Sequence, residues 1–305
     1  MPFGRFAEQF VESRRLALNR CIQKIVNHAQ LAMDPDLQLF LESDSFALDI
    51  KHRSRDSDRG GIMATIGNTI TGPKFYETDE WFDKKKGYLD ALESQLKGLA
   101  KAFEAVAKQR AETLPVIGEL AEALSVLGSS DLSKQLSSSL TSLAELERKS
   151  KDVMEQHTKH DLETILGTVD EYLRMISSVR LAFTSRQKLF YAWKAAEAEM
   201  TRVRSTHEKT LRQRGMDRQS ILPLQREIES ADSKAHDARS EFEKSTKLIK
   251  AEVARFEHER VMEFKAALEA FLDGMIDQQN EVIEAWEGYQ QVLLKRVGPA
   301  TAQAN

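Results

Sequence analysis

Apolar residues recur every three or four positions over most of this chain, with charged residues between them. The first long stretch starts at residue 77, where Thr78 or Asp79 can cap a helix. Its apolar register is formed by Leu89, Leu92, Leu96, Leu99, Phe103, Val106, Ile117, Leu120, Leu124 and Leu127. Spacings of three and four held over this length predict a helix that contributes a heptad seam to a coiled coil.

Two further long helices are predicted. Residues 128–131 (GSSD) are typical of a helix end followed by a cap, so a second helix is expected over about 132–212. Gly215 marks a break, and a third helix is expected from near Gln219 to about 298. The second helix has its clearest register at Leu162, Ile165, Val169, Tyr172, Ile176, Val179 and Phe183. The register of the third helix slips near Arg260 and restarts at Val261.

The unequal helix lengths predict the architecture. The second and third helices are much longer than the first, so residues 185–245 are expected to form an arm of only two helices. The three-helix part would keep excess apolar surface, which is best buried against a second copy or a related chain. The aromatic residues expected at that interface are Trp81, Phe82, Phe264, Phe271 and Trp286.

The N-terminal part has a different pattern. Residues 1–50 carry short helical periods, with Asp34 as an N-cap before Pro35, and residues 51–60 form a charged linker. An apolar stripe then follows at Ile62, Met63, Ile66 and Ile70. So short a segment is marginal as a helix in water, but a membrane interface could stabilise it. The alternative is a loop that packs on the bundle.

Composition agrees with long helices and a peripheral location. Of 305 residues, 30% are charged, and the 14 glycines and six prolines leave few turns. The single cysteine, Cys21, cannot form an internal disulfide, which fits a reducing compartment. The sequence has no apolar run long enough to span a bilayer, and residues 1–15 lack the apolar core of a signal peptide. We therefore expect a cytosolic protein that contacts membranes only peripherally.

Basic residues gather at the predicted tip of the arm although the net charge is −4. Between residues 202 and 218 there are six Lys/Arg and two acids, and three lysines follow on one helical face. The residues expected to attract anionic lipid are Arg202, Arg204, Lys209, Arg212, Arg214, Arg218, Lys244, Lys247 and Lys250. Each basic residue close to an anionic membrane contributes about 1 kcal/mol. The alternative is a solvated coiled-coil end.

Catalytic and metal-binding patterns are weak. His157 and His160 lie at positions i and i+3 of a predicted helix, but no third metal ligand is evident. The sequence contains no HExxH, glycine-rich phosphate loop or GxSxG motif. We expect no enzyme, no metal and no cofactor, and the negative net charge argues against a uniformly basic nucleic-acid binder.

Several stretches resemble the BAR-type sorting nexins of the retromer-associated subgroup. Glu12–Leu41 (ESRRLALNRCIQKIVNHAQLAMDPDLQLFL) is similar to the closing helices of a PX domain, with its RR-x-x-L opening and D-P-D-x-x-x-F-L ending. Glu80–Phe82 resembles the start of the first BAR helix. Leu124–Leu136 resembles the first turn of the BAR domain, between its first and second helices. Ile249–Lys265 (IKAEVARFEHERVMEFK) is similar to the third BAR helix and is the most specific match.

The resemblance implies an all-α fold in which three long antiparallel helices form an elongated coiled-coil BAR dimer, preceded by short PX helices. It divides the chain into PX helices (1–50), a linker with an amphipathic helix (51–76), a BAR domain (77–298) and a tail (299–305). The strands and the basic-aromatic motif that complete a PX pocket are absent, so the chain is expected to start late in that domain. Arg14 matches an arginine that helps hold a phosphoinositide and would bind weakly alone.

The function implied is a peripheral scaffold on endosomal membranes. It would form a homodimer, or a heterodimer with another BAR-type sorting nexin, bind anionic phosphoinositide-containing membrane, and sense or induce curvature in retromer-linked retrograde sorting, with the retromer core as a partner. The alternative of a different class is a coiled-coil tether or adaptor that binds only proteins.

Overall fold

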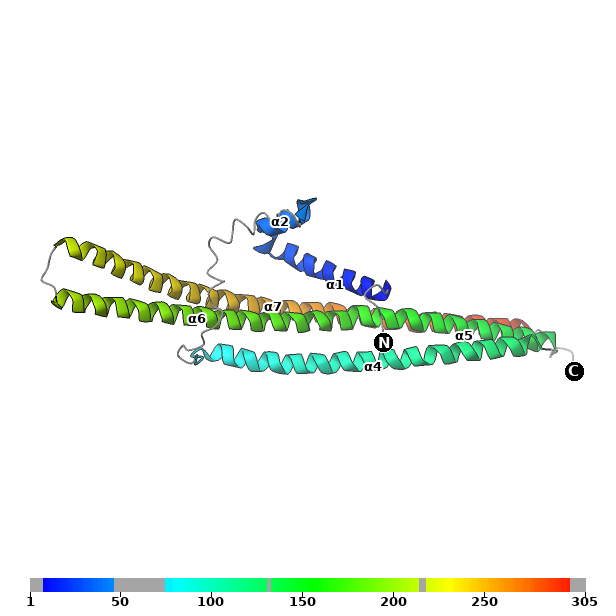
Figure 1. Cartoon of the computed structure of the whole chain (residues 1–305). Helices are drawn as coiled ribbons and strands as arrows, with labels where there is room; N and C mark the ends of the chain where they lie inside the picture. The colour runs from blue at the N-terminus through cyan, green and yellow to red at the C-terminus, as the bar shows by residue number, and fades with distance from the viewer. Residues whose placement is uncertain (1–7, 47–74, 131–132, 214–217, 297–305) are drawn as a thin grey trace. The chain divides into compact units, whose positions relative to one another are not determined.

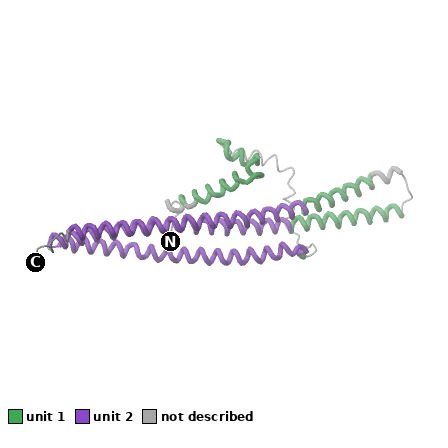
Figure 2. The backbone as a smooth tube through the Cα atoms, turned by 180° about the vertical axis from the view of Figure 1, so that it is seen from behind, with its two compact units in different colours: residues 1–76, 187–242 green, residues 77–186, 243–305 purple. Residues whose placement is uncertain are grey.

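The computed structural model describes residues 8–46, 75–130, 133–213 and 218–296, and within these ranges all regular structure is helical (Figure 1). This confirms the all-α prediction. The chain divides into two compact units, one of residues 1–76 and 187–242 and the other of residues 77–186 and 243–305 (Figure 2). The long helices α6 (Gly167–Gln213) and α7 (Arg218–Arg296) contribute to both units.

The N-terminal helices are α1 (Glu8–Asn27), the 3-10 turn η1 (Leu31–Met33) and α2 (Pro35–Glu42). Asp34 caps α2, because its carboxylate accepts a hydrogen bond of 2.7 Å from the backbone N–H of Asp36. Pro35 occupies the first helical position, where its missing N–H costs nothing. The predicted cap and helix start are therefore confirmed.

Helix α4 (Glu80–Gly128) is capped by Asp79, whose carboxylate accepts a hydrogen bond of 3.1 Å from the N–H of Trp81. It ends where α5 (Lys134–Asp161) returns along it, and the Ser137 hydroxyl donates to the carbonyl of Gly128. A Cβ on Gly128 would lie 3.0 Å from the hydroxyl oxygen of Thr141, so this close crossing favours glycine. The cap of α5 is Ser133, two residues beyond the predicted cap region.

The predicted second helix is continuous but changes its winding once. Helix α5 passes through a π-helical turn, η3 (Leu162–Leu166), into α6 (Gly167–Gln213). A π turn adds one residue and shifts which side chains face the core. The shift lies directly after Asp161, which is buried and paired with Arg110 of α4 at 2.5 Å. Sequence periodicity did not indicate this turn, because the register upstream of Leu162 was weak.

Helix α7 (Arg218–Arg296) has 79 residues and is about 120 Å long at about 1.5 Å per residue. It runs antiparallel to α6, because Arg204 pairs with Asp232 while Tyr172 donates to Glu263. It runs parallel to α4, where Lys85 pairs with Glu257 and Phe103 contacts Phe271. The three predicted long helices, with the middle one antiparallel to the others, are confirmed.

The core of residues 77–186 and 243–305 comes from all three helical paths. Its buried members are Leu89, Leu92, Leu96, Ala100, Ile165, Val169, Tyr172, Ile176 and Phe256. Burial raises the pKa of the Tyr172 hydroxyl, which donates a hydrogen bond of 2.9 Å to Glu263. A second cluster, of Phe82, Ile249 and Val253, lies near the start of α4.

The predicted seam of α4 is buried in its first half only. Beyond Ala100 the buried positions of α4 are Ala121 and Gly128, small residues that let α5 approach closely. The larger seam residues Leu120 and Leu127 lie beside them and are half exposed. A straight helix drifts by about 20° per heptad, which turns a heptad seam away from its first partner over this length.

Candidate functional site

Residues 77–186 and 243–305 leave a large amount of apolar surface uncovered by their own chain. On the C-terminal half of α7 the exposed large apolar residues are Val261, Met262, Leu268, Leu272, Met275, Ile276, Ile283, Trp286 and Leu294. Exposed apolar residues also follow α4, at Leu99, Val106, Val116, Leu120, Val126 and Leu127. Monomeric proteins rarely expose so many large apolar side chains together, and such surfaces are typical of association. We call the α7 set the α7 apolar stripe.

Four of the five aromatic residues expected at an interface contact the chain's own core. Phe82 is only 4% exposed and packs in the cluster with Ile249 and Val253, which corrects the expectation that it faces a second copy. Phe264 and Phe271 are partly buried against the main core. Phe264 and Phe271 belong to the same shifted register as Val261, Leu268 and Met275. In that register the aliphatic residues are exposed, whereas the two aromatic residues pack on the core.

The two tryptophans differ from each other. Trp81 packs against Phe82 and Phe183. Trp286 is 46% exposed and contacts Tyr289, so it can contribute to the α7 apolar stripe.

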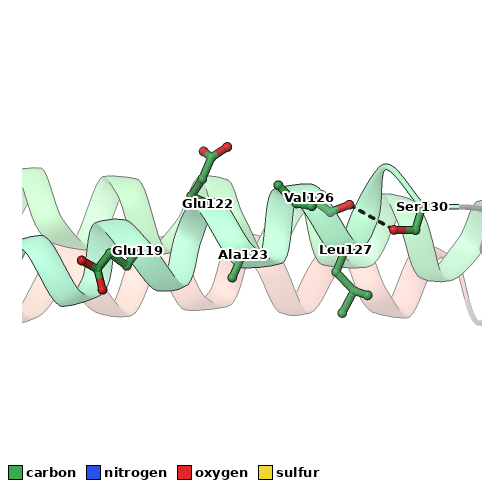
Figure 3. A pocket seen from close by; sticks show the side chains of 6 residues that line it. All are labelled: Glu119, Glu122, Ala123, Val126, Leu127 and Ser130. Carbon is green, nitrogen blue, oxygen red and sulfur yellow. Dashed lines mark hydrogen bonds between the residues drawn. The ribbon is translucent and has the colours of Figure 1, made fainter.

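The C-terminal end of α4 carries a shallow hollow. Its lining combines apolar Ala123, Val126 and Leu127 with Glu119, Glu122 and Ser130 (Figure 3). The Ser130 hydroxyl donates to the carbonyl of Val126, so it belongs to the helix end. An open apolar hollow with a carboxylate rim suits packing against another helix better than holding a small molecule.

The arm, residues 187–213 and 218–242, is built by α6 and α7 alone. Trp193 stacks on Phe242 with ring centroids 5.5 Å apart, and His207 is buried with its Nε2 2.9 Å from Glu227. Three of the predicted basic residues form ion pairs within the arm. They are Arg202 with Glu199, Arg204 with Asp232, and Arg212 with Glu208, at 2.6 to 2.7 Å.

The other predicted basic residues differ in their exposure and in their ion pairing. Lys209 is exposed on α6, as are Lys244 and Lys247 on α7. Arg214 and the side chain of Arg218 lie outside the described residues. Lys250 pairs with Asp79 at 2.6 Å and lies over the rings of Trp81 and Phe82, so it is occupied inside its own unit. We therefore remove Lys250 from the surface expected to attract lipid.

A cluster of charges holds the chain where it enters α4. Arg186 of α6 is 3% exposed, and its guanidinium makes two hydrogen bonds to the Glu77 carboxylate, at 2.6 and 3.2 Å. It also donates to the Thr246 hydroxyl of α7 at 3.0 Å and lies 3.8 Å from the centre of the Phe82 ring.

Asp79 adds a second ion pair to this cluster, with Lys250. The hydrogen bond from the Lys250 ammonium is the main reason that the pKa of the Asp79 carboxyl lies below its ordinary value. We call Glu77, Asp79, Arg186, Thr246 and Lys250 the entry clamp. No local pattern in the sequence predicts this cluster, because Glu77 and Asp79 lie more than 100 positions from Arg186 and Lys250.

Phe75 makes contacts of its own with α6. Its ring lies 5.0 Å from that of Phe190, and its backbone N–H donates to the Tyr191 hydroxyl at 3.1 Å. The apolar stripe at residues 62–70, with Ile62, Met63, Ile66 and Ile70, lies outside the described residues. Arg14 is exposed on α1.

Among the described residues, no three His, Cys, Asp or Glu side chains come together in a way that could hold a metal ion. The Nε2 of His160 lies 3.1 Å from the carbonyl oxygen of Ala270. In the part of the chain that the structure describes, no helix combines the length and apolar character needed to cross a bilayer.

Comparison with known proteins places the chain in context. Residues 56–292 match the family model described as Vps5 C terminal like, and residues 1–44 match that of the PX domain. The chain is 32% identical over 300 residues to the vacuolar protein sorting-associated protein vps5 of Schizosaccharomyces pombe, covering 94% of this chain and 52% of that protein. It is 29% identical to sorting nexin-2 of Bos taurus and 28% identical to human sorting nexin-1, covering 92% of this chain and 54% of each.

The chain thus spans about half the length of the curated relatives it matches. Among solved structures, the I-BAR domain of Dictyostelium discoideum IBARa aligns with 75% of this chain and 94% of its own, with a TM-score of 0.43 and 11% identity.

Proposed function

The chain belongs to the Vps5 and sorting nexin family, whose members are structural adaptors and not enzymes, and we propose that it is a peripheral membrane scaffold. In this proposal the chain dimerises, binds anionic membranes of the endosome through its arms, and senses or induces curvature. The observation that carries the proposal is the combination, in one chain, of an uncovered apolar stripe on the bundle and an arm with exposed basic residues.

Dimerisation is supported by the α7 apolar stripe and the exposed leucines and valines of α4. Burying one such side chain completely contributes about 1.5–3 kcal/mol, and a symmetric dimer buries each position twice, so the stripe favours association. Trp81 and Trp286 remain candidates for this interface, with Phe264 and Phe271 supporting it from the core side. The partner is a second copy of this chain or another BAR-type sorting nexin.

Membrane binding is proposed through Arg202, Arg204, Lys209, Arg212, Arg214, Arg218, Lys244 and Lys247. The ion pairs of Arg202 and Arg212 do not argue against this, because both join neighbouring turns of one exposed helix. Such pairs contribute about 0.5 kcal/mol or less, so phosphate oxygens can replace the carboxylates. The contacts are exposed, so binding should weaken steeply as salt rises.

Curvature is proposed to need the apolar segment at residues 62–70 as well as the arms. Burying Ile66 and Ile70 at the headgroup level contributes roughly 3–6 kcal/mol, enough to fold a short segment on a membrane. Changing both to Asp should weaken binding to anionic vesicles only partly but should strongly reduce tubule formation. If the double variant cannot be purified as a dimer, the segment packs on the bundle instead.

The cellular setting is proposed from the family. It is retrograde sorting from endosomes with the retromer core as a partner, and phosphoinositide recognition in which Arg14 contributes only weakly. A pull-down tests this partner directly: the purified retromer core should be retained on resin that carries this chain and should not be retained on resin without it.

The competing proposal is a coiled-coil adaptor that binds only proteins, which the internally paired arm arginines favour. Co-sedimentation with vesicles separates the two. A membrane scaffold should sediment with vesicles that contain anionic lipid and phosphoinositide and should stay in solution with neutral vesicles. A chain that stays in solution with both is the adaptor.

A further inference from the structure

We propose that a buried polar layer in the bundle, residues 77–186 and 243–305, sets the radius of curvature that this chain imposes on a membrane. The layer consists of Arg110 of α4, His160 and Asp161 of α5, and Gly274 of α7. It holds three helices in one register at a level where two helical paths are irregular. This inference rests on the proposed function and adds residues that position the helices without touching lipid themselves.

The polar layer connects α5 to both of its neighbours. Arg110 pairs with Asp161 at 2.5 Å, and Asp161 is only 7% exposed. The Nε2 of His160 lies 3.1 Å from the carbonyl oxygen of Ala270, which can only accept, so Nε2 is the donor. A Cβ on Gly274 would lie 2.6 Å from the His160 ring, so glycine leaves the room that this contact needs. Each neighbour of α5 is therefore held by a directional polar contact.

Two helical paths depart from a regular α-helix beside this layer. The π turn η3 follows Asp161 directly. The Thr164 hydroxyl donates to the carbonyl of His160 at 2.8 Å, a kind of contact that often bends helices. On α4, Pro115 lies five residues beyond Arg110 inside the helix, where it has no N–H to donate. Prolines and π turns are the usual causes of helix bends, so the layer lies where the bundle is able to bend.

Stability alone does not account for a polar layer at this place. Along the path of α5 and α6, the buried apolar residues nearest to the layer are Leu146 and Val153 before it and Ile165 and Val169 after it. Apolar residues of similar volume in place of a buried ion pair are often neutral or stabilising. Among the described residues, the buried Nδ1 of His157 in the preceding turn has no hydrogen-bond partner, which adds a further cost.

The layer provides a unique register for the three helices. Apolar side chains of a seam can exchange places when one helix slides by a turn, about 5.4 Å, but an arginine and a buried aspartate cannot. The ion pair fixes α4 on α5, and the space beside Gly274 fixes α7 on α5. A bend held in one register is the same in every molecule, so membrane tubules should be uniform in diameter. Without the layer the helices should still pack, but the bend should vary.

The first test fills the space beside Gly274. Gly274→Ala places a methyl group where the His160 ring lies and leaves the ion pair unchanged. Gly288→Ala is the matched control on the same helix, because its new methyl group meets no atom of the described residues within 4 Å. Hydrogen exchange over residues 158–168 is measured without membrane. Co-sedimentation with anionic vesicles reports binding, and electron microscopy gives the tubule diameters.

The Gly274→Ala variant should separate shape from binding. Exchange over residues 158–168 should become at least tenfold faster, because the His160 contact is lost. Sedimentation should stay within twofold of the parent, since the layer does not touch lipid. The spread of tubule diameters should at least double. Gly288→Ala should match the parent in all three measurements.

The second test replaces the ion pair of the layer by apolar residues. Arg110→Met/Asp161→Leu should also at least double the spread of tubule diameters, without lowering the urea midpoint of unfolding. Lys85→Met/Glu257→Leu is its control, because it removes another ion pair that joins α4 to a neighbouring helix and that is only partly exposed. The control should form tubules as uniform as those of the parent.

Tubules as uniform as the parent's in Gly274→Ala, or unchanged exchange, overturn the inference and leave the proposed function standing. An equal change in Gly288→Ala overturns it too, as does a loss of sedimentation in Gly274→Ala, since a merely structural role would lower binding as well. If Gly274→Ala loses helicity, the ion-pair variant decides, and unchanged diameters there overturn the inference. A parent chain that neither binds nor tubulates anionic vesicles overturns the proposed function, and this inference with it.

Discussion

The bundle of residues 77–186 and 243–305 and the arm of residues 187–242 are built from the same two helices but bury different side chains. In the bundle, α6 and α7 meet a third helix, and Leu89, Val169, Tyr172 and Ile176 are fully buried. In the described part of the arm, only Val203, His207 and Ala235 are buried. The arm is held instead by aromatic contacts such as Trp193 with Phe242 and by ion pairs such as Arg204 with Asp232.

The difference shows how helix number determines the chemistry of a surface. Two helices alone enclose few side chains, so the described part of the arm buries only Val203, His207 and Ala235 and carries charged residues around them. Three helices enclose an apolar core and still leave leucines on the outside. The first arrangement suits contact with a charged surface, and the second suits contact with another apolar surface.

The largest effect is expected where the bundle is proposed to meet a second copy. Leu268→Asp/Ile276→Asp changes two exposed residues of the α7 apolar stripe and should raise the dimer dissociation constant at least a thousandfold, about 4 kcal/mol, because unpaired carboxylates would be buried. Light scattering should report a monomer of unchanged helicity. Leu211→Asp, on an exposed position of the arm, should remain a dimer. Dimers in both variants would mean that association occurs elsewhere.

Core truncation should show that stability resides in the bundle. Leu89→Ala removes a fully buried side chain and should lower the free energy of unfolding by about 3 kcal/mol, within the range for such cavities. Leu181→Ala, where the side chain is 68% exposed, should change it by less than about 0.5 kcal/mol. Urea unfolding followed by circular dichroism measures both. Equal losses would mean that Leu181 is covered in the assembled protein.

Charge removal from the arm should affect lipid binding but leave the fold intact. Lys209→Gln/Arg212→Gln removes two exposed charges and should weaken binding to anionic vesicles by about 2 kcal/mol, roughly 30-fold. The unfolding free energy should change by less than about 0.5 kcal/mol, since exposed ion pairs contribute little. Lys97→Gln/Lys108→Gln on α4 is the control with the same charge change. Equal loss of binding in the control would mean that net charge, not the arm, governs adhesion.

The smallest effect concerns acid stability at the entry clamp. The lowered pKa of Asp79 means that its stabilising contribution is complete above the ordinary aspartate value of about 3.9 and is lost as pH falls through the lowered value. Asp79→Asn should therefore be slightly less stable than the parent at pH 7, by less than about 1 kcal/mol, and equal to it at the acid end. Thermal melting across pH measures the difference. A constant difference at all pH values would mean that the Lys250 contact does not depend on the charge of Asp79.

The sequence was sufficient for elements that depend on local chemistry. Asp34 was recognisable as a cap, and Asp79 as one of two candidate caps, because an N-cap needs only an acceptor before the first turn. The fold followed from periodicity over long stretches, where each three- or four-residue spacing supports the next.

Features that depend on partners distant in the sequence could not be predicted. Phe82 was expected at an interface because aromatic residues are common there, but its own chain covers it. The Arg186–Glu77 pair joins the middle of α6 to the residues just before α4, and the buried Asp161–Arg110 pair joins α4 to α5 directly before the π turn at Leu162–Leu166. The candidate lipid surface was predicted as a cluster of like charges, and only the structure shows which of them already have carboxylate neighbours.

The proposal that this chain bends membranes is tested most directly by electron microscopy of vesicles. The purified chain is added to vesicles with and without anionic lipid and phosphoinositide, and the vesicles are imaged after negative staining. The account predicts tubules coated with protein on the anionic vesicles and spherical, uncoated neutral vesicles. Anionic vesicles that stay spherical at protein concentrations where the chain is bound would contradict it.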